Sequence, residues 1–324
     1  MAFTLPTIDE VRQAANSVCQ VMQPTPQYCW PLLCERLGAE VWVKHENHTP
    51  TGSFKARTAV VYTQGLMKRE PRTRGLITAT RGNHGQSVAL AARKFGLPAM
   101  VVVPRGNSVE KNAAMRAQGA QLIEYGNDYQ EAREYAASHE AELGFHFVPP
   151  FHRDIVTGVA TYWLEVFSAL PDLDVAFVPI GMGSGISAAS AVRNEFGLKT
   201  KLVGVVSELA PTYARSFEQK RCVEAPTSTQ LADGLACRKP DATALGVLLE
   251  NVERVMTVSE AQVSEAMRIF FTDTHNVVEG AGAAALAAAL KEKDELKGKK
   301  VAVVATGGNV DHDVFARVLQ GKTD

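Results

Sequence analysis

Short apolar and β-branched runs that alternate with helical patterns constrain the fold of this chain most. Runs of strand length lie at 40–44, 75–80, 99–103, 121–124, 175–180, 201–206 and 300–305. Helical patterns stand between most of them, as at 86–95 and 187–196. Strands that are apolar almost throughout, alternating with helices, are typical of parallel sheets covered on both faces. The sequence therefore predicts an α/β fold.

Length and composition narrow the class of protein. The 324 residues are 46% hydrophobic and 21% charged, which suits two packed lobes, and no stretch resembles a linker. The net charge of -1 gives no broad positive surface for nucleic acid or an anionic membrane. The apolar stretch 281–290 is too short to span a bilayer, and residues 1–10 lack the features of a signal peptide. We therefore expect a cytoplasmic protein with a small-molecule partner.

Cysteine usage agrees with this location. The chain has five cysteines, an odd number without the spacing of a metal site, at Cys19, Cys29, Cys34, Cys222 and Cys237. We expect all of them to be reduced thiols, as is usual in the cytoplasm.

One lysine has an unusual setting. Lys55 ends the run Thr51-Gly52-Ser53-Phe54-Lys55, in which a glycine and a serine can begin a helix. Most lysines are solvated surface charges. Here the apolar neighbours Phe54 and Ala56 and the positive end of the helix would both lower the pKa of the amine. A neutral lysine amine forms Schiff bases with carbonyl groups, and pyridoxal phosphate is the foremost of these in enzymes.

A glycine-rich loop follows the strand at 175–180. It reads Gly181-Met182-Gly183-Ser184-Gly185 and leads into an alanine-rich helix near Ile186. Inward-pointing N–H groups and the helix start suit a phosphate, although a tight turn without a ligand has equal weight for an isolated glycine cluster. A dinucleotide site, with Glu208 as the ribose ligand, is weaker because Ile186 stands where the third glycine is needed.

Two further segments follow strand ends. Thr80, Arg81, Gly82, Asn83 and His84 lie between the strand at 75–80 and the helix at 86–95. N–H groups at that helix start can bind a substrate carboxylate, and the Asn83 amide can donate to an aromatic oxygen. A histidine here caps or packs more often than it catalyses.

Thr306 follows the strand near the C-terminus and opens Thr306-Gly307-Gly308-Asn309. It would present a neutral hydroxyl at the carboxyl end of a strand, where ligands of α/β proteins gather.

Together these motifs, in this order, resemble the fold-type II pyridoxal-phosphate enzymes, and most closely the serine/threonine dehydratase (ammonia-lyase) and serine racemase branch. The likeness runs from Thr25-Pro26 through 231–234 and 278–282 to Asp311. It implies a two-lobed fold like that of the tryptophan synthase β chain, and a homodimer. A large cofactor-binding domain would comprise 1–67 and 152–324, and a small domain that binds the substrate carboxylate would comprise 68–151.

The resemblance also implies the roles of the site residues. Lys55 would be the Schiff-base lysine and the base that removes the Cα proton. The cofactor-binding residues would be Phe54, Asn83 at the phenolic oxygen, Gly181, Met182, Gly183, Ser184 and Gly185 at the phosphate, and Thr306 at the pyridine nitrogen. Thr80, Arg81, Gly82 and His84 would bind the substrate. Because Thr306 is neutral, it should not hold the pyridine protonated, which favours prompt loss of a β-hydroxyl from threonine or serine. The products would be a 2-oxo acid and ammonia.

At a few positions the sequence differs from the serine racemase pattern, and these differences narrow the activity that we expect. Serine racemases carry a serine at position 81, whereas Arg81 cannot deprotonate, so racemisation is disfavoured. Glu208 matches one acidic ligand of a divalent ion, but Thr212 and Ala214 stand where the other ligands would fall, so we expect no metal.

Several alternatives remain open. Arg81 and the stretch 234–238 leave room for phenylserine or threo-3-hydroxyaspartate as the substrate. A β-replacement synthase would use the same fold. Outside this class, a nucleotide-binding oxidoreductase would use the glycine loop.

Overall fold

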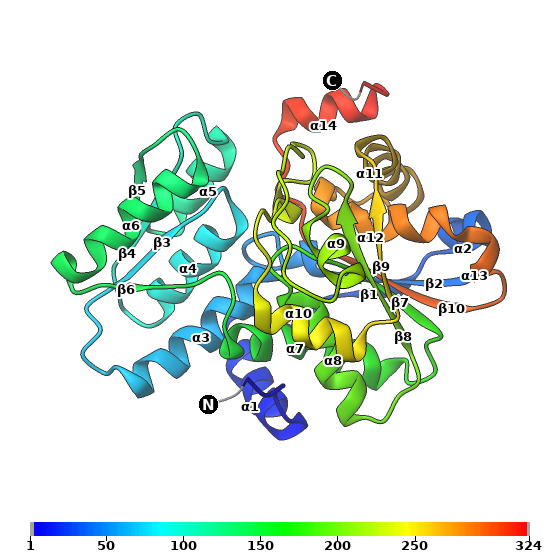
Figure 1. Cartoon of the computed structure of the whole chain (residues 1–324), viewed down its shortest axis with the longest axis horizontal. Coiled ribbons are helices and arrows are strands. Elements are labelled where there is room, and N and C mark those ends of the chain that lie inside the picture. Colours follow the sequence, from blue (N-terminus) through cyan, green and yellow to red (C-terminus); the bar gives the residue numbers. More distant parts are fainter. Residues whose placement is uncertain (1–2, 323–324) are drawn as a thin grey trace.

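Two sheets organise the computed structural model, which describes residues 3–322 (Figure 1). The larger sheet has the strand order β1-β2-β10-β7-β8-β9, and the smaller has the order β5-β4-β3-β6. Neighbouring strands run parallel except for β1, which pairs antiparallel with β2 at the edge of the larger sheet. The predicted α/β fold is confirmed.

The strands of the two sheets are interleaved with helices along the chain. In the larger sheet they are β1 (Gln27–Cys29), β2 (Glu40–His45), β7 (Val175–Pro179), β8 (Lys201–Ser207), β9 (Arg254–Val258) and β10 (Lys300–Ala305). In the smaller sheet they are β3 (Leu76–Ala79), β4 (Ala99–Val103), β5 (Gln121–Glu124) and β6 (His146–Phe147).

Helices cover both faces of the larger sheet to form the large lobe. One face packs against α2 (Pro31–Leu37), α11 (Glu260–Thr274) and α12 (Gly280–Lys291). The other packs against α1 (Ile8–Cys19), α7 (Arg153–Ala169), α8 (Ser184–Glu195) and α10 (Ala242–Asn251). The remaining elements of this lobe are η1 (Glu46–His48), α9 (Thr212–Glu218), η2 (Asp233–Leu235), α13 (Lys293–Leu296) and α14 (His312–Leu319).

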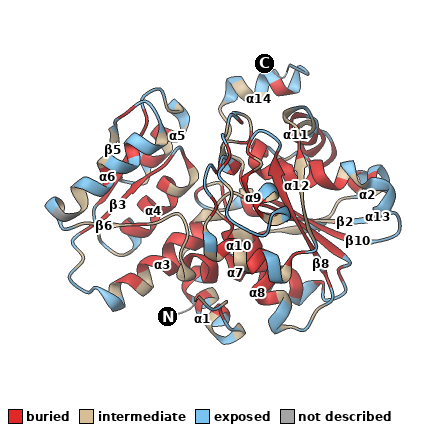
Figure 2. Cartoon of the chain, viewed as in Figure 1, coloured by how far each residue is buried: buried red, intermediate tan, exposed pale blue. Residues whose placement is uncertain are grey.

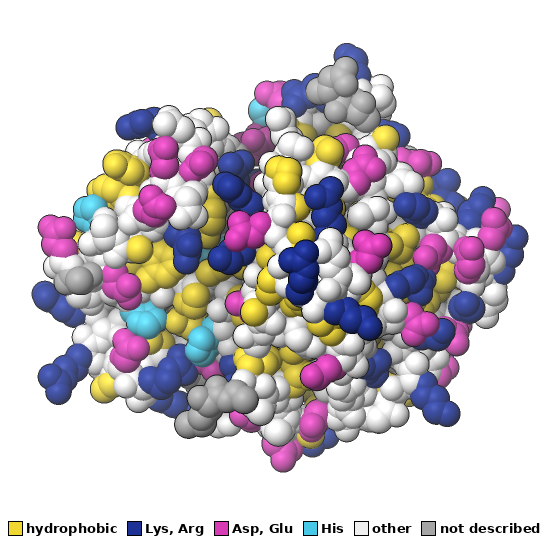
Figure 3. Space-filling model, viewed as in Figure 1, with side chains coloured by type: hydrophobic (Ala, Val, Ile, Leu, Met, Phe, Trp, Pro, Cys, Tyr) yellow, Lys and Arg dark blue, Asp and Glu magenta, His cyan; other side chains and the backbone are white. Residues whose placement is uncertain are grey.

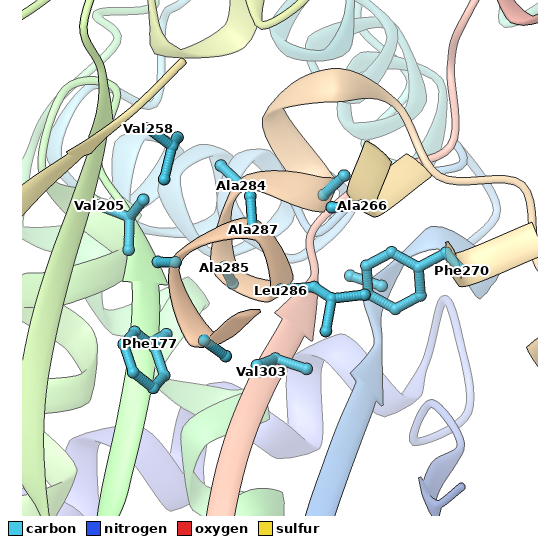
Figure 4. Close-up of a cluster of buried hydrophobic side chains, with 14 of the residues drawn as sticks. Phe177, Val205, Val258, Ala266, Phe270, Ala284, Ala285, Leu286, Ala287 and Val303 are labelled. Carbon is cyan, nitrogen blue, oxygen red and sulfur yellow. The ribbon is translucent and has the colours of Figure 1, made fainter. Parts of the chain in front are cut away.

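The alanine-rich helix α12 explains the packing of one face. Its small side chains, such as Ala284 and Ala287, let the helix lie close to the sheet among Phe177, Val205 and Val303 (Figure 4). Figure 2 shows that this helix and the central strands are largely buried. No helix of residues 3–322 is both long enough and apolar enough to cross a membrane.

The small lobe repeats this layering on the smaller sheet. One face packs against α3 (Lys55–Arg69), α4 (Asn83–Lys94) and α5 (Val109–Ala117), and the other packs against α6 (Tyr129–Leu143). Helix α3 carries the chain out of the large lobe, and α7 brings it back. The site residues therefore come from loops of both lobes.

Several element bounds differ from the prediction. Strands β1, β6 and β9 are not predicted, because two of them are very short and β9 is only half-buried at an edge, which removes the continuous apolar run. Helices α4 and α8 begin at Asn83 and Ser184, three residues earlier than predicted. Their first turns are polar or glycine-rich and lack the apolar period on which the prediction depended.

Candidate active site

The loop before α3 is joined to the segment after β10 by backbone hydrogen bonds. The Phe54 N–H donates to the Thr306 carbonyl at 3.0 Å, and the Gly308 N–H donates to the Gly52 carbonyl at 2.9 Å. Gly52 has a φ of 66°, and a Cβ there would lie 2.6 Å from Asn309 Oδ1, so only glycine fits this junction. These bonds bring Thr306 beside the start of the helix that carries Lys55.

Lys55 is the first residue of α3. Although part of its side chain is accessible, burial of the amine lowers its pKa from 10.5 to about 8. Burial, and then the charge of Lys55, lower the pKa of His84 to about 3, so the two side chains lie close to each other. At neutral pH a larger fraction of Lys55 is therefore a neutral nucleophile than for an exposed lysine.

The glycine loop forms a cradle between β7 and α8. Gly183 caps α8 with a φ of 95° and without a side-chain hydrogen bond. The N–H groups of 181–185 donate to no protein acceptor in the described part of the chain. Tyr213 fixes the loop by donating its hydroxyl to the Met182 carbonyl at 3.0 Å, and the buried Ser187 Oγ behind it has no partner within residues 3–322. Free N–H groups at a helix start suit a phosphate.

The small lobe has a similar helix start at α4. Thr80 Oγ1 accepts the Gly82 N–H at 3.0 Å and so fixes the turn before α4. The N–H groups of 83–85 have no protein acceptor among the residues that the structure covers, which leaves them for a carboxylate. His84 Nδ1 is buried without a partner there. Arg81 is exposed, and no ion pair of it is found in the described chain.

Asn83 is held from the large lobe. Its Nδ2 donates to Glu279 Oε1 at 2.6 Å, and Asn309 Nδ2 donates to its Oδ1 at 2.7 Å. Burial raises the pKa of Glu279 to about 7, while the nearby Lys111 opposes this shift. Asn83 therefore keeps one N–H for a ligand in a fixed direction.

Glu279 and Asn309 were not predicted as site residues. The signal for Glu279 was available, since it is the one charged residue of 276–290. An acid inside an otherwise apolar stretch is buried only where a partner exists.

Side chains join the lobes along the opening of the site. Lys111 of α5 donates to Asp233 at 2.8 Å, and its stem lies against Gly82, where an added Cβ would be 2.8 Å from Lys111 Cδ. Glu110 pairs with His312 on the same side. Figure 3 shows basic and acidic side chains gathered where the two lobes meet.

The residues around Lys55 fit pyridoxal phosphate. Thr51 Oγ1 and Ser53 Oγ, like His84 Nδ1 and Ser187 Oγ, are buried and have no partner in the described structure. Uncompensated burial of polar groups is costly, so several of them around one lysine indicate a ligand with many acceptors and donors. An aromatic aldehyde with a phosphate provides these groups.

The positions compared above with a divalent-ion site, Glu208, Thr212 and Ala214, offer few metal ligands. Glu208 is exposed, whereas Thr212 is buried. Within residues 3–322, no three His, Cys, Asp or Glu side chains are grouped so that they could hold a metal ion.

The fold and site thus define an α/β protein with a lysine at one helix start and a glycine-rich loop at another, and comparison with known proteins identifies its family. The profile of the family described as "Pyridoxal-phosphate dependent enzyme" matches residues 18–307. The chain is 36% identical over 314 residues to the L-threonine ammonia-lyase of Thermotoga maritima, covering 97% of this chain and 78% of that protein. It is 33% identical over 322 residues to the L-threo-3-hydroxyaspartate ammonia-lyase of Saccharomyces cerevisiae, covering 99% and 98%.

A solved structure has the same fold. The processed form of threonine deaminase isoform 2 from Solanum lycopersicum has a TM-score of 0.89 and 28% identity, over 98% of this chain and 90% of that one. This chain belongs to the family of pyridoxal-phosphate-dependent enzymes, and its cofactor is pyridoxal 5′-phosphate. The predicted family and cofactor are confirmed.

Proposed function

We propose that this protein is an ammonia-lyase that acts on an L-β-hydroxy amino acid, with threonine and serine as the first candidates. Loss of the β-hydroxyl as water gives an enamine, which water hydrolyses to a 2-oxo acid and ammonia. The observation that carries this proposal is the position of Lys55 at the start of α3, close to His84 in the first turn of α4, whose N–H groups have no acceptor in the described chain. The names of the Thermotoga and yeast relatives support the same class of reaction.

Residues from both lobes would bind the cofactor. Lys55 would bind the aldehyde carbon of the cofactor, and the N–H groups of 181–185 with Ser187 would hold its phosphate. Asn83 would use its remaining N–H for the phenolic oxygen, and Thr306 would face the pyridine nitrogen, with Phe54 beside the ring. When bound, the cofactor supplies an electron-accepting ring that stabilises negative charge at Cα.

Substrate handling would fall to the small lobe and to Lys55. The N–H groups of 83–85, together with Thr80, Gly82 and His84, would hold the α-carboxylate. Once its amine is released by the incoming amino acid, Lys55 would take the Cα proton, for which a pKa near 8 is well matched. Arg81 provides no proton acceptor opposite Lys55, so elimination is favoured over racemisation.

An acidic substrate is the second candidate. The stem of Lys111 lies beside Gly82, next to the exposed Arg81, and two cationic side chains there would suit a second carboxylate such as that of threo-3-hydroxyaspartate. Asp233 already pairs with Lys111, however, which offsets much of its charge. Threonine and serine therefore remain first, followed by threo-3-hydroxyaspartate and then phenylserine.

The wider context is part of the same proposal. We infer a catabolic enzyme of the cytoplasm, a homodimer, and no requirement for a divalent ion. The small lobe, 68–151, would be the domain that closes on the substrate. Sedimentation velocity would test the dimer, and activity after treatment with EDTA would test the metal.

A substrate screen tests the function directly. The protein loaded with pyridoxal phosphate should absorb in the visible and should release 2-oxo acid from L-threonine or L-serine at equal yield with ammonia. L-threo-3-hydroxyaspartate and phenylserine belong to the same screen. No release from any of the four substrates would contradict the proposal, and product formed only with added sulfide would identify a β-replacement synthase. If a protein without activity still absorbs in the visible, it has kept the cofactor, and the missing activity is then not caused by loss of the cofactor.

A further inference from the structure

Two cysteines lie close together at the β1 edge of the larger sheet. Cys29 is the last residue of β1, and Cys34 lies in the first turns of α2. Their sulfur atoms are 3.3 Å apart, within hydrogen-bond distance for sulfur. A disulfide bond is about 2.05 Å long, so the sulfurs need to approach each other by only about 1.3 Å.

The elements that carry the pair set this proximity. Trp30 caps α2 and Pro31 begins it, so the chain turns directly from the edge strand into the helix. β1 pairs with β2, and the Val41 N–H of β2 donates to Cys34 Sγ at 3.2 Å. The pair is therefore fixed from both sides.

Both cysteine residues are partly accessible at the surface. Cys29 and Cys34 are half-buried, and they are flanked by Tyr28 and Leu32, which are each 52% exposed. The remaining thiols differ, since Cys19 and Cys222 are exposed, Cys237 is buried, and none of these has a sulfur neighbour among the described cysteines.

We propose that Cys29 and Cys34 form a reversible dithiol–disulfide pair that is oxidised by low-molecular-weight disulfides such as glutathione disulfide. The sulfur of one cysteine attacks glutathione disulfide, forms a mixed disulfide and releases one glutathione. The second sulfur then attacks the first, forms the Cys29–Cys34 bond and releases the other glutathione. Two thiols lose two protons and two electrons, which reduce one glutathione disulfide to two glutathiones.

The surroundings determine which sulfur attacks first. Burial, and then the hydrogen bond and charge of Cys34, raise the pKa of Cys29 to about 12. Cys34 therefore attacks the glutathione disulfide. Once Cys34 is in the mixed disulfide, it no longer raises the pKa of Cys29, which can then release its proton and close the bond.

Peptide mapping tests the pair in the cofactor-loaded protein. Trypsin releases residues 13–36 as one peptide, which contains Cys19, Cys29 and Cys34, so the test uses a Cys19→Ser background. After exposure to glutathione disulfide and alkylation, we expect this peptide to be lighter by two hydrogens and free of alkyl groups. Dithiothreitol should restore two alkylated sites.

Matched controls make the result decisive. The exposed Cys222 should carry glutathione under the same conditions, which shows that the oxidant reached the protein. If the peptide keeps two alkylated thiols, or takes two glutathiones, while Cys222 is modified, the proposal is wrong. Adding either Cys29→Ser or Cys34→Ser should trap one glutathione on the remaining cysteine, and should do so more slowly on Cys29, whose pKa is still raised by burial. The reverse pattern would contradict the order of attack. Visible absorbance of the bound cofactor checks that each variant is folded.

Discussion

The two halves of the site are built by different kinds of contact. In the large lobe, backbone hydrogen bonds join the loop before Lys55 to Thr306, and the Glu279 N–H donates to the Gly307 carbonyl at 2.9 Å. The small-lobe half is tied to the large lobe through side chains, as in the bonds of Asn83 to Glu279 and of Lys111 to Asp233. Backbone contacts persist through most substitutions, whereas side-chain contacts do not. We therefore expect the part of the site in the large lobe to tolerate little change, and we call it the fixed half. The part in the small lobe can change more easily, and we call it the adjustable half.

A buried ion network supports the fixed half. Arg57 lies two residues after Lys55 and donates to Glu46 at 2.8 Å and to Glu165 at 2.6 Å. Arg57 and Glu46 are almost completely buried, at 1% and 0% side-chain exposure. Lys44 completes the network through Glu165. This network anchors the first turn of α3 to the sheet.

The largest effect should come from Lys55→Ala. The variant should fold but lose on the order of 10⁴-fold in kcat, because the covalent and general-base roles are each worth ~10²-fold or more. Steady-state release of 2-oxo acid measures the loss. Lys68→Ala, an exposed lysine of the same helix, is the control and should keep full activity. Near-native turnover in the Lys55 variant would exclude its assignment.

Arg57→Ala should reduce the stability of the protein by disrupting the ion network of the fixed half. The change leaves Glu46 buried without its cation and Glu165 with Lys44 alone, and removing one partner of a buried ion pair typically costs about 3–5 kcal/mol of unfolding free energy. Urea unfolding measures this change.

Lys111→Ala is the matched test in the adjustable half. Lys111 and Asp233 are more accessible, with 13% and 26% side-chain exposure. We expect a smaller loss of stability than for Arg57→Ala and a rise in KM. Equal losses of stability in the two variants would remove the contrast between the halves.

Glu279→Gln should change the pH dependence of stability. In the cofactor-free protein the pKa of Glu279 is raised from 4.5 to about 7, so the folded state binds more protons than the unfolded state between these values. Stability should therefore fall as the pH rises through this window, by about 3 kcal/mol for this shift. The Gln variant should lose this slope, and Glu208→Gln, at an exposed acid, should keep it. Unfolding at pH 5 and pH 8 compares the three proteins.

The smallest effect should come from Arg81→Ala, in the adjustable half. If Arg81 binds the preferred substrate, kcat/KM for that substrate should fall roughly 10- to 150-fold, the value of a charge-assisted hydrogen bond of about 1.5–3 kcal/mol. L-serine should be affected less. Ratios of kcat/KM across L-serine, L-threonine, phenylserine and threo-3-hydroxyaspartate measure the difference. An equal change in all four would show that Arg81 does not select the substrate.

The sequence predicts the fixed half better than the adjustable one. Lys55 and the loop 181–185 stand in local patterns, where a strand end, glycines and a helix start are consecutive in the chain, and the structure places both at helix starts as expected. The bond of Asn83 to Glu279 joins residues that are 196 positions apart. A local sequence pattern does not reveal such a contact, because the contact depends on how the two lobes pack against each other. Strand β9 was missed for the same reason, because its pairing with β8, rather than its composition, makes it a strand.

The close packing of α3 against α7 has a consequence for engineering. A Cβ on Gly158 of α7 would lie 2.7 Å from the Arg57 carbonyl of α3, so the helix that leaves the large lobe and the helix that returns to it touch. The whole segment between them is therefore inserted at a single point of the large lobe. Recombination between relatives at these two junctions would exchange that segment as one cassette, with new residues around 80–84 and an unchanged cofactor cradle. Libraries built in this way would vary specificity while the catalytic lysine and its supports stay constant.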